Sequence, residues 1–173
     1  MEYVCKIATL EEIETRMNDI IATEPDNPLL YQAKEYAING YNEKNRIMYI
    51  GKLGGKTICE ATVYIDDKAF CNETTKPLYL IQENRVYLSY AEVNIEYEGR
   101  GYFSKLMDFV ADDLLDKGYT ELSIGLKPED TINMQIFFKL GFVYYIKTTV
   151  DFPPTTDNAT TIQNIKNFYY KKL

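Results

Sequence analysis

Two glycines flank an arginine in the stretch VNIEYEGRGYFSKLM, residues 93–107, just before a helical pattern begins. The first amides of a helix have no carbonyl partners and lie at the positive end of the helix dipole, so a helix entered through glycine-flanked backbone suits an anion. The groups that could converge on a phosphate are the first amides and the polar side chains beside them, namely the amides of Gly101, Tyr102, Phe103 and Ser104, the Ser104 hydroxyl, and the cations of Arg100 and Lys105. Glycines at this spacing also occur in simple tight turns, so the short motif alone leaves both interpretations open.

The composition limits which partners are expected. The 173 residues carry a net charge of −7, with a pI near 4.7 and no histidine. Nucleic-acid binding depends on Lys and Arg, so neither DNA nor RNA is expected as the main partner. The lack of His also makes zinc unexpected, and we predict no metal site. An acidic surface attracts cations, amines included, although the charge equally well serves only to keep the protein in solution.

The sequence contains no signal for export or membrane insertion. The start MEYVCKIATLEEIE has no basic region followed by an apolar run, and no stretch reaches about 18 uninterrupted apolar residues. Cys5, Cys59 and Cys71 are odd in number and form no C-x-x-C pair, which is typical of reduced thiols. We therefore expect a cytoplasmic protein with no membrane partner. The length and the lack of linkers or repeats predict a single domain over residues 1–173.

The succession of strand and helix patterns predicts an α/β fold around a mixed sheet. The clearest element is a helix over residues 102–117, in which apolar residues recur at offsets of three and four. It lies between strands predicted at 86–93 and 121–126, and this succession implies that the two strands are parallel. The other predicted elements are strands over 3–8, 46–52, 56–66, 143–151 and 167–172, a helix that begins at a capping box of Thr9 and Glu12, a helix over 29–38 that ends near Gly40, and a helix over 131–140.

The run GKLGGKT, residues 51–57, ends like a phosphate-binding P-loop. Its first glycine is one residue too close to the GKT, and the strand-like run ICEATVYI follows where a P-loop requires a helix. We therefore interpret the glycines of this run as the turn of a β-hairpin.

Two runs of sequence together resemble the GNAT superfamily of N-acetyltransferases. The run VNIEYEGRGYFSKLM is similar to that family's acyl-CoA-binding motif, V-x-x-x-Y-R-G-x-G-x-G-x-x-L-L. The later run NMQIFFKLGFVYY, residues 133–145, is similar to the family's N-x-x-A-x-x-L-Y-E-K-L-G-F, and the two runs occur in the family's order. The resemblance implies a mixed, mostly antiparallel central sheet with a splayed parallel strand pair and helices on both faces. It also implies acetyl-CoA as the acyl donor.

The resemblance assigns acetyl-CoA binding to the first motif and to the later helix. The pantetheine would pair with exposed backbone at Val93 and Ile95, and the pyrophosphate would lie on the helix start from Gly99 to Ser104. The binding set implied in this way is Val93, Ile95, Glu98, Gly99, Arg100, Gly101, Tyr102, Phe103, Ser104, Asn133 and Lys139. Glu98 replaces a usual glutamine or arginine, and Phe103 replaces a usual glycine or alanine. Neither change removes a backbone amide, so both bear on affinity more than on binding itself.

Acetyl transfer to an amine requires a base, a polarised carbonyl and a departing thiolate. Without histidine, the base must be a carboxylate, a tyrosine, or water held by one of these. Glu92 lies on an otherwise apolar strand, where a charge needs a partner or a wet cleft, and we predict that it is the base. A purely structural ion pair is an equal alternative. Strand alternation would place Tyr87 and Ser89 on the opposite face from Glu92, and many family members have a glutamate at the position of Tyr87.

The family's usual acid is also missing. Phe137 occupies the position at which members commonly have a tyrosine that protonates the departing thiolate. A phenyl ring cannot donate a proton, so Ser89, Tyr144 and Tyr145 are the candidate donors, unless the thiolate leaves unaided. The predicted catalytic set is therefore Glu92, Ser89 and Tyr144.

These observations favour an acetyl-CoA-dependent N-acetyltransferase that acts on a primary amine of a small molecule or peptide, by direct attack within a ternary complex. A catalytically silent acyl-CoA-binding or regulatory module on the same fold is the alternative, which Phe137 and Tyr87 favour. An interaction domain without a CoA site is a third interpretation. No motif identifies the acceptor, and the resemblance implies that a homodimer is common.

Overall fold

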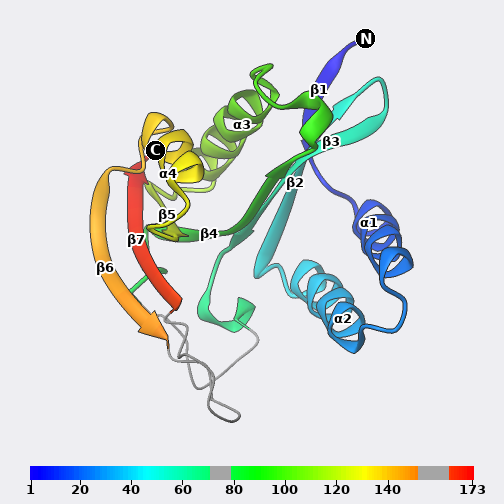
Figure 1. Ribbon diagram of the computed structural model, residues 1–173, viewed down its shortest axis with the longest axis horizontal. Coiled ribbons are helices and arrows are strands. Elements are labelled where there is room, and N and C mark those ends of the chain that lie inside the picture. Colours follow the sequence, from blue (N-terminus) through cyan, green and yellow to red (C-terminus); the bar gives the residue numbers. More distant parts are fainter. Residues whose placement is uncertain (71–78, 152–163) are drawn as a thin grey trace.

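The computed structural model describes residues 1–70, 79–151 and 164–173; Cys71 lies outside these ranges. Within them, seven strands form one sheet in the order β1-β2-β3-β4-β5-β7-β6, flanked by four helices (Figure 1). In chain order the elements are β1 (Tyr3–Ile7), α1 (Leu10–Thr23), α2 (Pro28–Asn42), β2 (Arg46–Leu53), β3 (Lys56–Tyr64), β4 (Arg85–Val93), α3 (Tyr102–Asp116), β5 (Glu121–Leu126), α4 (Thr131–Lys139), β6 (Tyr144–Asp151) and β7 (Asn164–Lys172). All neighbouring strands are antiparallel except β4 and β5, so the mixed, mostly antiparallel α/β sheet is confirmed.

The parallel pair separates part-way along its length. Pairing between β4 and β5 runs only from Arg85 opposite Glu121 to Leu88 opposite Ile124. Beyond this point β4 continues to Val93 alongside β3, while the end of β5 pairs with β7. The predicted splay is therefore present, and it leaves one side of the last residues of β4 without a strand neighbour.

The helices cover both faces of the sheet (Figure 1). One face carries the main core, to which α3 contributes its buried stripe of Leu106, Met107, Val110 and Leu114 and α4 contributes Phe137. Burying each such side chain contributes about 1.5–3 kcal/mol, which fixes α3 on the sheet and gives its first turn a defined position. On the other face, Ile13 of α1 packs with Ala8 and Ile50.

The first helix begins as its sequence predicts. The Thr9 side chain accepts from the Glu12 N–H, and the Glu12 carboxylate accepts from the Thr9 N–H at 3.0 Å. Lys6 and Lys52 also bind this carboxylate, at 3.0 and 2.9 Å. Burial acts to raise the pKa of Glu12, but these hydrogen bonds outweigh it and lower the pKa to about 2. Glu12 thus ties α1 to β1 and β2.

The second helix is longer than the sequence predicts. It continues through Gly40 to Asn42, four residues beyond the predicted range of 29–38. A Cβ at Gly40 would lie 2.4 Å from Cδ of Arg46, so the glycine is required for close packing of β2 against the helix. The last strand also begins three residues earlier than expected, at Asn164.

The glycines at 54 and 55 form the predicted hairpin turn. Both have positive φ angles, 57° and 88°, and Leu53 pairs directly with Lys56 across the turn. This is the backbone of a two-residue hairpin loop, so the P-loop interpretation is excluded. Within the described ranges, none of the helices has the length and apolar character needed to cross a membrane.

Candidate functional site

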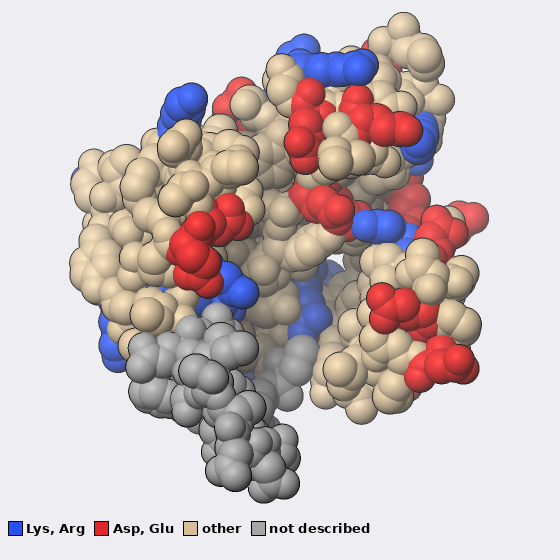
Figure 2. Space-filling view, in the orientation of Figure 1, with Lys and Arg blue, Asp and Glu red and all other residues tan. Residues whose placement is uncertain are grey.

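A cleft of about 1720 Å³ opens where β4 leaves β5. Its walls come from α1, the start of β3, the end of β4, the segment that leads into α3, and α4. Figure 2 shows the molecule hollowed between its two helix layers, with carboxylate side chains around the hollow. The predicted residues that line this cleft are Glu92, Val93, Ile95, Glu98, Gly99, Gly101, Tyr102, Phe103, Ser104 and Asn133.

The start of α3 presents free backbone to the cleft. Gly101 is the N-cap with a left-handed φ of 79° and no side-chain cap. The first amide to bond within the helix is that of Lys105, which donates to the Gly101 carbonyl, so the amides of Tyr102, Phe103 and Ser104 precede the helical ladder. A Cβ at Gly99 or Gly101 would meet nothing within 4 Å. The predicted anion cradle is therefore open.

Tyr3 on β1 holds this helix start in place. Its hydroxyl donates to the Tyr102 carbonyl at 2.8 Å, and the two rings lie 4.8 Å apart. Burial, reinforced by hydrogen bonds with Cys5 and Cys59, raises the pKa of Tyr3 far above its usual range, so the hydroxyl remains a donor. No local pattern in the sequence connects residues 3 and 102.

The backbone at the end of β4 is extended at Val93 and turns at Ile95. The Asn94 N–H donates to the Ile58 carbonyl of β3 at 2.8 Å. Because backbone groups alternate in direction along a strand, the N–H and C=O of the preceding residue, Val93, point away from β3 and into the splay. The Val93 backbone is therefore free of β3 on this side, and its pairing with a ligand stays a prediction. Ile95 begins a short 3₁₀ turn, Ile95–Tyr97, so backbone pairing at Ile95 would not continue the strand, and that pairing stays a prediction. Its side chain, 79% exposed, instead forms part of the cleft wall.

Glu92 belongs to a charged cluster that joins α1, β3 and β4. Arg16 of α1 donates to both carboxylate oxygens of Glu60, Nε at 2.8 Å and Nη2 at 2.9 Å, and its Nη2 lies 3.6 Å from Glu92. Glu60 and Glu92 are direct cross-strand partners. Two like charges in such a pair are destabilising unless a cation lies between them, and Arg16 occupies that position.

The two carboxylates of this cluster differ in exposure. The Glu60 side chain is 7% exposed, whereas that of Glu92 is 51% exposed and open to the cleft. Tyr90 donates a hydrogen bond to Glu92, and burial followed by this bond raises the pKa of Tyr90 well above its usual value. Tyr90 therefore remains protonated at neutral pH, and Glu92 is the group that can accept a proton. The ion pair and the wet cleft, predicted as alternatives for Glu92, are both present.

A β-bulge in β4 overturns the predicted alternation of side chains. Val63 pairs with Leu88 and Thr62 pairs with Tyr90, so Ser89 has no partner across β3. The inserted residue shifts the faces, and Tyr87, predicted opposite Glu92, lies on the same face as Glu92. Tyr87 packs with Tyr64 and Phe70, and burial raises its pKa to about 12. It cannot replace the missing glutamate as a base near neutral pH.

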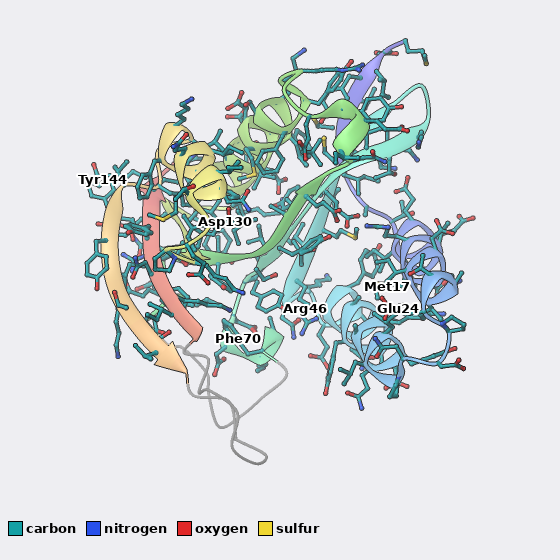
Figure 3. All side chains as sticks on the ribbon, in the orientation of Figure 1. Met17, Glu24, Arg46, Phe70, Asp130 and Tyr144 are labelled. Carbon is teal, nitrogen blue, oxygen red and sulfur yellow. The ribbon has the colours of Figure 1, made fainter. Side chains whose placement is uncertain are left out.

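The candidate proton donors do not gather at the cleft. The Ser89 hydroxyl donates to the Thr62 carbonyl at 3.1 Å and faces a smaller cavity instead. Tyr144 lies on the edge strand β6, with β7 and β5 between it and β4, and stacks on Tyr170 at 4.9 Å (Figure 3). Tyr145, on the same strand, contacts Tyr169. The structure therefore does not bring Ser89 or Tyr144 together with Glu92.

Phe137 lines the cleft but is 6% exposed, edge-on to Phe103 at 6.0 Å between ring centres. Asn133 lines it too, and both its N–H and its side-chain amide donate to Asp130, the N-cap of α4. Figure 3 shows Asp130 on the opposite side of the hollow from α1. Two residues of the implied CoA set, Arg100 and Lys139, are not part of the cleft wall.

Three site residues were missed by the sequence reasoning. Glu60 had a visible signal, since it is the one charge within the apolar run ICEATVYI. Tyr90 could have been found from its position two residues before Glu92, on the same strand face. Arg16 had no local signal, because its contact with Glu60 joins residues 44 positions apart.

A model of the acetyltransferase (GNAT) family matches residues 7–142 of this chain. The chain belongs to the GNAT family of acetyltransferases. No curated protein sequence is similar enough to count as a match. The matched range of this GNAT protein includes the cleft, from α1 to the end of α4, and stops before β6.

Solved structures share the fold of this GNAT protein at low sequence identity. An N-acetyltransferase from Staphylococcus aureus Mu50 has a TM-score of 0.65 at 13% identity, over 99% of both chains. PaiA N-acetyltransferase from Thermoplasma acidophilum, in complex with coenzyme A, has a TM-score of 0.61 at 12% identity over 100% of both chains. A GNAT family acetyltransferase from Elizabethkingia anophelis with acetyl-CoA bound gives 0.61 at 15%, over 99% of this chain and 98% of that one. At these identities the likeness shows the fold alone.

Proposed function

We propose that this protein is an acetyl-CoA-dependent N-acetyltransferase that acetylates a primary amine by direct attack within a ternary complex. The observation that carries this proposal is that an open helix start and a half-exposed carboxylate, Glu92, line the same cleft. The first can hold the donor's pyrophosphate and the second can accept the acceptor's proton.

Donor binding would use backbone more than side chains. The amides that precede the helical ladder of α3 would hold the pyrophosphate, and the Val93 backbone that points into the splay would pair with the pantetheine. Asn133 would contact the donor from α4. Two fold relatives hold CoA or acetyl-CoA, which supports the same class of donor here.

Glu92 would act as the base in the transfer of the acetyl group from the thioester to the amine. An alkyl ammonium has a pKa near ~10, so the nitrogen must lose a proton before it can attack. Glu92, directly or through a water, takes that proton; the nitrogen lone pair then forms the N–C bond to the thioester carbonyl carbon. As the tetrahedral adduct collapses, the C–S bond breaks and its electron pair leaves with sulfur. The second N–H proton is lost, and the products are an N-acetyl amide, CoA thiol and one released proton.

The departing thiolate would leave without a protein acid. Phe137 has no proton to give, and neither Ser89 nor Tyr144 lines the cleft. A thiol of pKa near ~8.5 is a tolerable leaving group at neutral pH, so the reaction does not require a donor. Solvent in the open cleft can return the proton.

The acceptor end of the cleft is suited to a cationic amine. Glu11 and Asp19 of α1 line it together with Glu92, and neither has an ion-pair partner among the residues that the structure describes. A cleft lined by uncompensated negative charge concentrates cations and speeds their entry. The amine would therefore arrive as an ammonium and be deprotonated at Glu92.

The second candidate, a silent acyl-CoA-binding module, is favoured by Phe137 and by the lack of a glutamate at the position of Tyr87. The experiment that separates the two is thiol release from acetyl-CoA with polyamines, arylalkylamines, aminoglycosides, amino acids and peptide N-termini. Turnover of any amine, with the N-acetyl product seen by mass spectrometry, would support the enzyme. Binding of acetyl-CoA without turnover across the whole panel would contradict it.

A further inference from the structure

A second cavity, of about 170 Å³, lies on the α1–α2 face of the sheet. Its walls are mainly aromatic and aliphatic, with Ile13, Ala37, Tyr41, Met48, Tyr64 and Tyr90 as the main contributors. The charged residue in its wall is Arg46, which stacks over Tyr64 at 4.6 Å from the ring centre and lies between the sheet and α2 (Figure 3). This cavity played no part in the proposed reaction.

The cavity adjoins the proposed base. Tyr90 lines the cavity, and its hydroxyl donates to Glu92, which lines the cleft. On α1, Ile13 lines the cavity and Arg16, one turn later, lines the cleft. Glu92 follows Tyr90 by two residues on the same face, which corresponds to about 7 Å along a strand. A molecule with its nitrogen at Glu92 can therefore reach this cavity with a short linker.

We propose that this cavity binds the apolar part of the acceptor, so that the preferred acceptor is a primary monoamine with one compact aromatic or branched aliphatic group two or three carbons from the nitrogen. This inference rests on the proposed acetyltransferase function and specifies its substrate class. An engineered apolar cavity of about 150 Å³ is known to hold benzene, so 170 Å³ suits a single ring.

The charge pattern selects against diamines at this position. The carboxylates of Glu11, Asp19 and Glu92 lie on the cleft side and attract one ammonium group. A second ammonium that extended into the cavity would lose its water and approach the Arg46 guanidinium, which already lies over the Tyr64 ring of the cavity wall. A ring in the same place buries its apolar surface against tyrosine, isoleucine and methionine.

Kinetics with three matched amines provide the first test. We expect kcat/KM for 2-phenylethylamine to exceed that for ethylamine, which lacks the ring, by about 10- to 100-fold, in line with the transfer of one ring-sized apolar group out of water. It should exceed that for 1,4-diaminobutane by a similar factor. Equal or higher kcat/KM for the diamine would overturn the proposed acceptor class while leaving the acetyltransferase function intact.

Three substitutions on one face of α2 provide the second test. Ala37→Leu places three more carbons in the cavity and should abolish the preference for 2-phenylethylamine over ethylamine. Ala33→Leu, one turn earlier on α2, is exposed and outside the cavity, and should retain it. Tyr41→Ala, which enlarges the cavity, should admit the two-ring tryptamine that the native cavity excludes. An unchanged preference in both Ala37→Leu and Tyr41→Ala would overturn the proposal.

Binding without turnover provides a third test, independent of catalysis. With methionine methyl groups labelled in the full chain, 2-phenylethylamine should shift the Met48 signal, and Ala37→Leu should remove the shift while Ala33→Leu keeps it. If that pattern holds but no amine is acetylated, the cavity assignment stands and the acetyltransferase function fails. If Met48 does not respond and no preference for the ring is measured, the cavity assignment is wrong.

Discussion

Replacing Arg16 with methionine should destabilise the fold more than replacing its partner Glu60. The guanidinium forms two short hydrogen bonds, 2.8 and 2.9 Å, with a carboxylate whose side chain is 7% exposed. Removing one partner of a buried pair costs about 3–5 kcal/mol, because the other charge stays buried without compensation. Arg16 is itself 34% exposed, so solvent screening lowers our expectation for Arg16→Met to about 2–4 kcal/mol.

Replacing Glu60 leaves the Arg16 guanidinium where water can solvate it. In Glu60→Met, Arg16 keeps its contact with Glu92 and its access to water, so we expect a loss of about 1 kcal/mol. In the double variant Arg16→Met/Glu60→Met the buried carboxylate and its partner are both removed, so no charge of this pair is left without a partner, and its stability should lie within about 1 kcal/mol of the wild type. The double variant should therefore be more stable than Arg16→Met alone.

Urea unfolding at neutral pH measures the free energy of unfolding of the wild type, the two single variants and the double variant. With a slope of about 2 kcal/mol per molar urea, the midpoint for Arg16→Met should fall by about 1–2 M. Lys56→Met is the control, since Lys56 and Glu96 form an exposed pair at 4.0 Å and its removal should cost less than about 0.5 kcal/mol. A midpoint for Arg16→Met equal to that of the wild type, or a double variant less stable than that single variant, would refute the reasoning.

Three further predictions concern catalysis and acid stability. Glu92→Gln should lower kcat by about 10²- to 10⁴-fold with little change in acetyl-CoA affinity, measured by thiol release and calorimetry; unchanged turnover would leave Glu92 a structural role only. Phe137→Tyr should change kcat modestly if the thiolate leaves unaided, whereas an inactive wild type whose Phe137→Tyr variant gains activity would favour the silent module. The depressed pKa of Glu12, about 2, means that its contribution is present above its unfolded pKa near ~4.3 and is lost as the pH falls from about 5 toward 2. Wild type should therefore be more stable than Glu12→Gln at pH 7 by about 1–2 kcal/mol, a difference that disappears near pH 2 in urea titrations; a difference independent of pH would contradict the assignment.

The parts of the fold that could be predicted are those with a local cause. The stripe of α3 repeats every three or four residues, and the structure places this helix at Tyr102–Asp116, within one residue of the prediction. The hairpin follows from the positive φ that Gly54 and Gly55 allow. The helix start at Gly101 lines the cleft because its glycines, its helix and the preceding strand are all encoded in one short run.

The parts that could not be predicted depend on pairing between distant segments. The bulge at Ser89 arises from the pairing register of β3 and β4. No residue type in β4 indicates this insertion, so strict alternation placed Tyr87 on the wrong face of the sheet. Tyr144 is remote from the cleft because β7 inserts between β5 and β6, which chain order does not reveal. Gly40 lies within α2, where the lack of a side chain leaves room for Arg46, and this contact cannot be read from the local sequence.

Calorimetric titration with acetyl-CoA tests the central claim, that the open start of α3 holds the acyl donor. Gly101→Val fills the cradle with a branched side chain, and Gly118→Val is its matched control, because Gly118 follows the other end of the same helix, has a positive φ of 90° and has equally open space around it. Both variants carry a similar backbone strain, about 1–2 kcal/mol. We predict that wild type and Gly118→Val bind acetyl-CoA with similar Kd values and that folded Gly101→Val does not bind. Equal affinity in Gly101→Val and Gly118→Val would contradict the account.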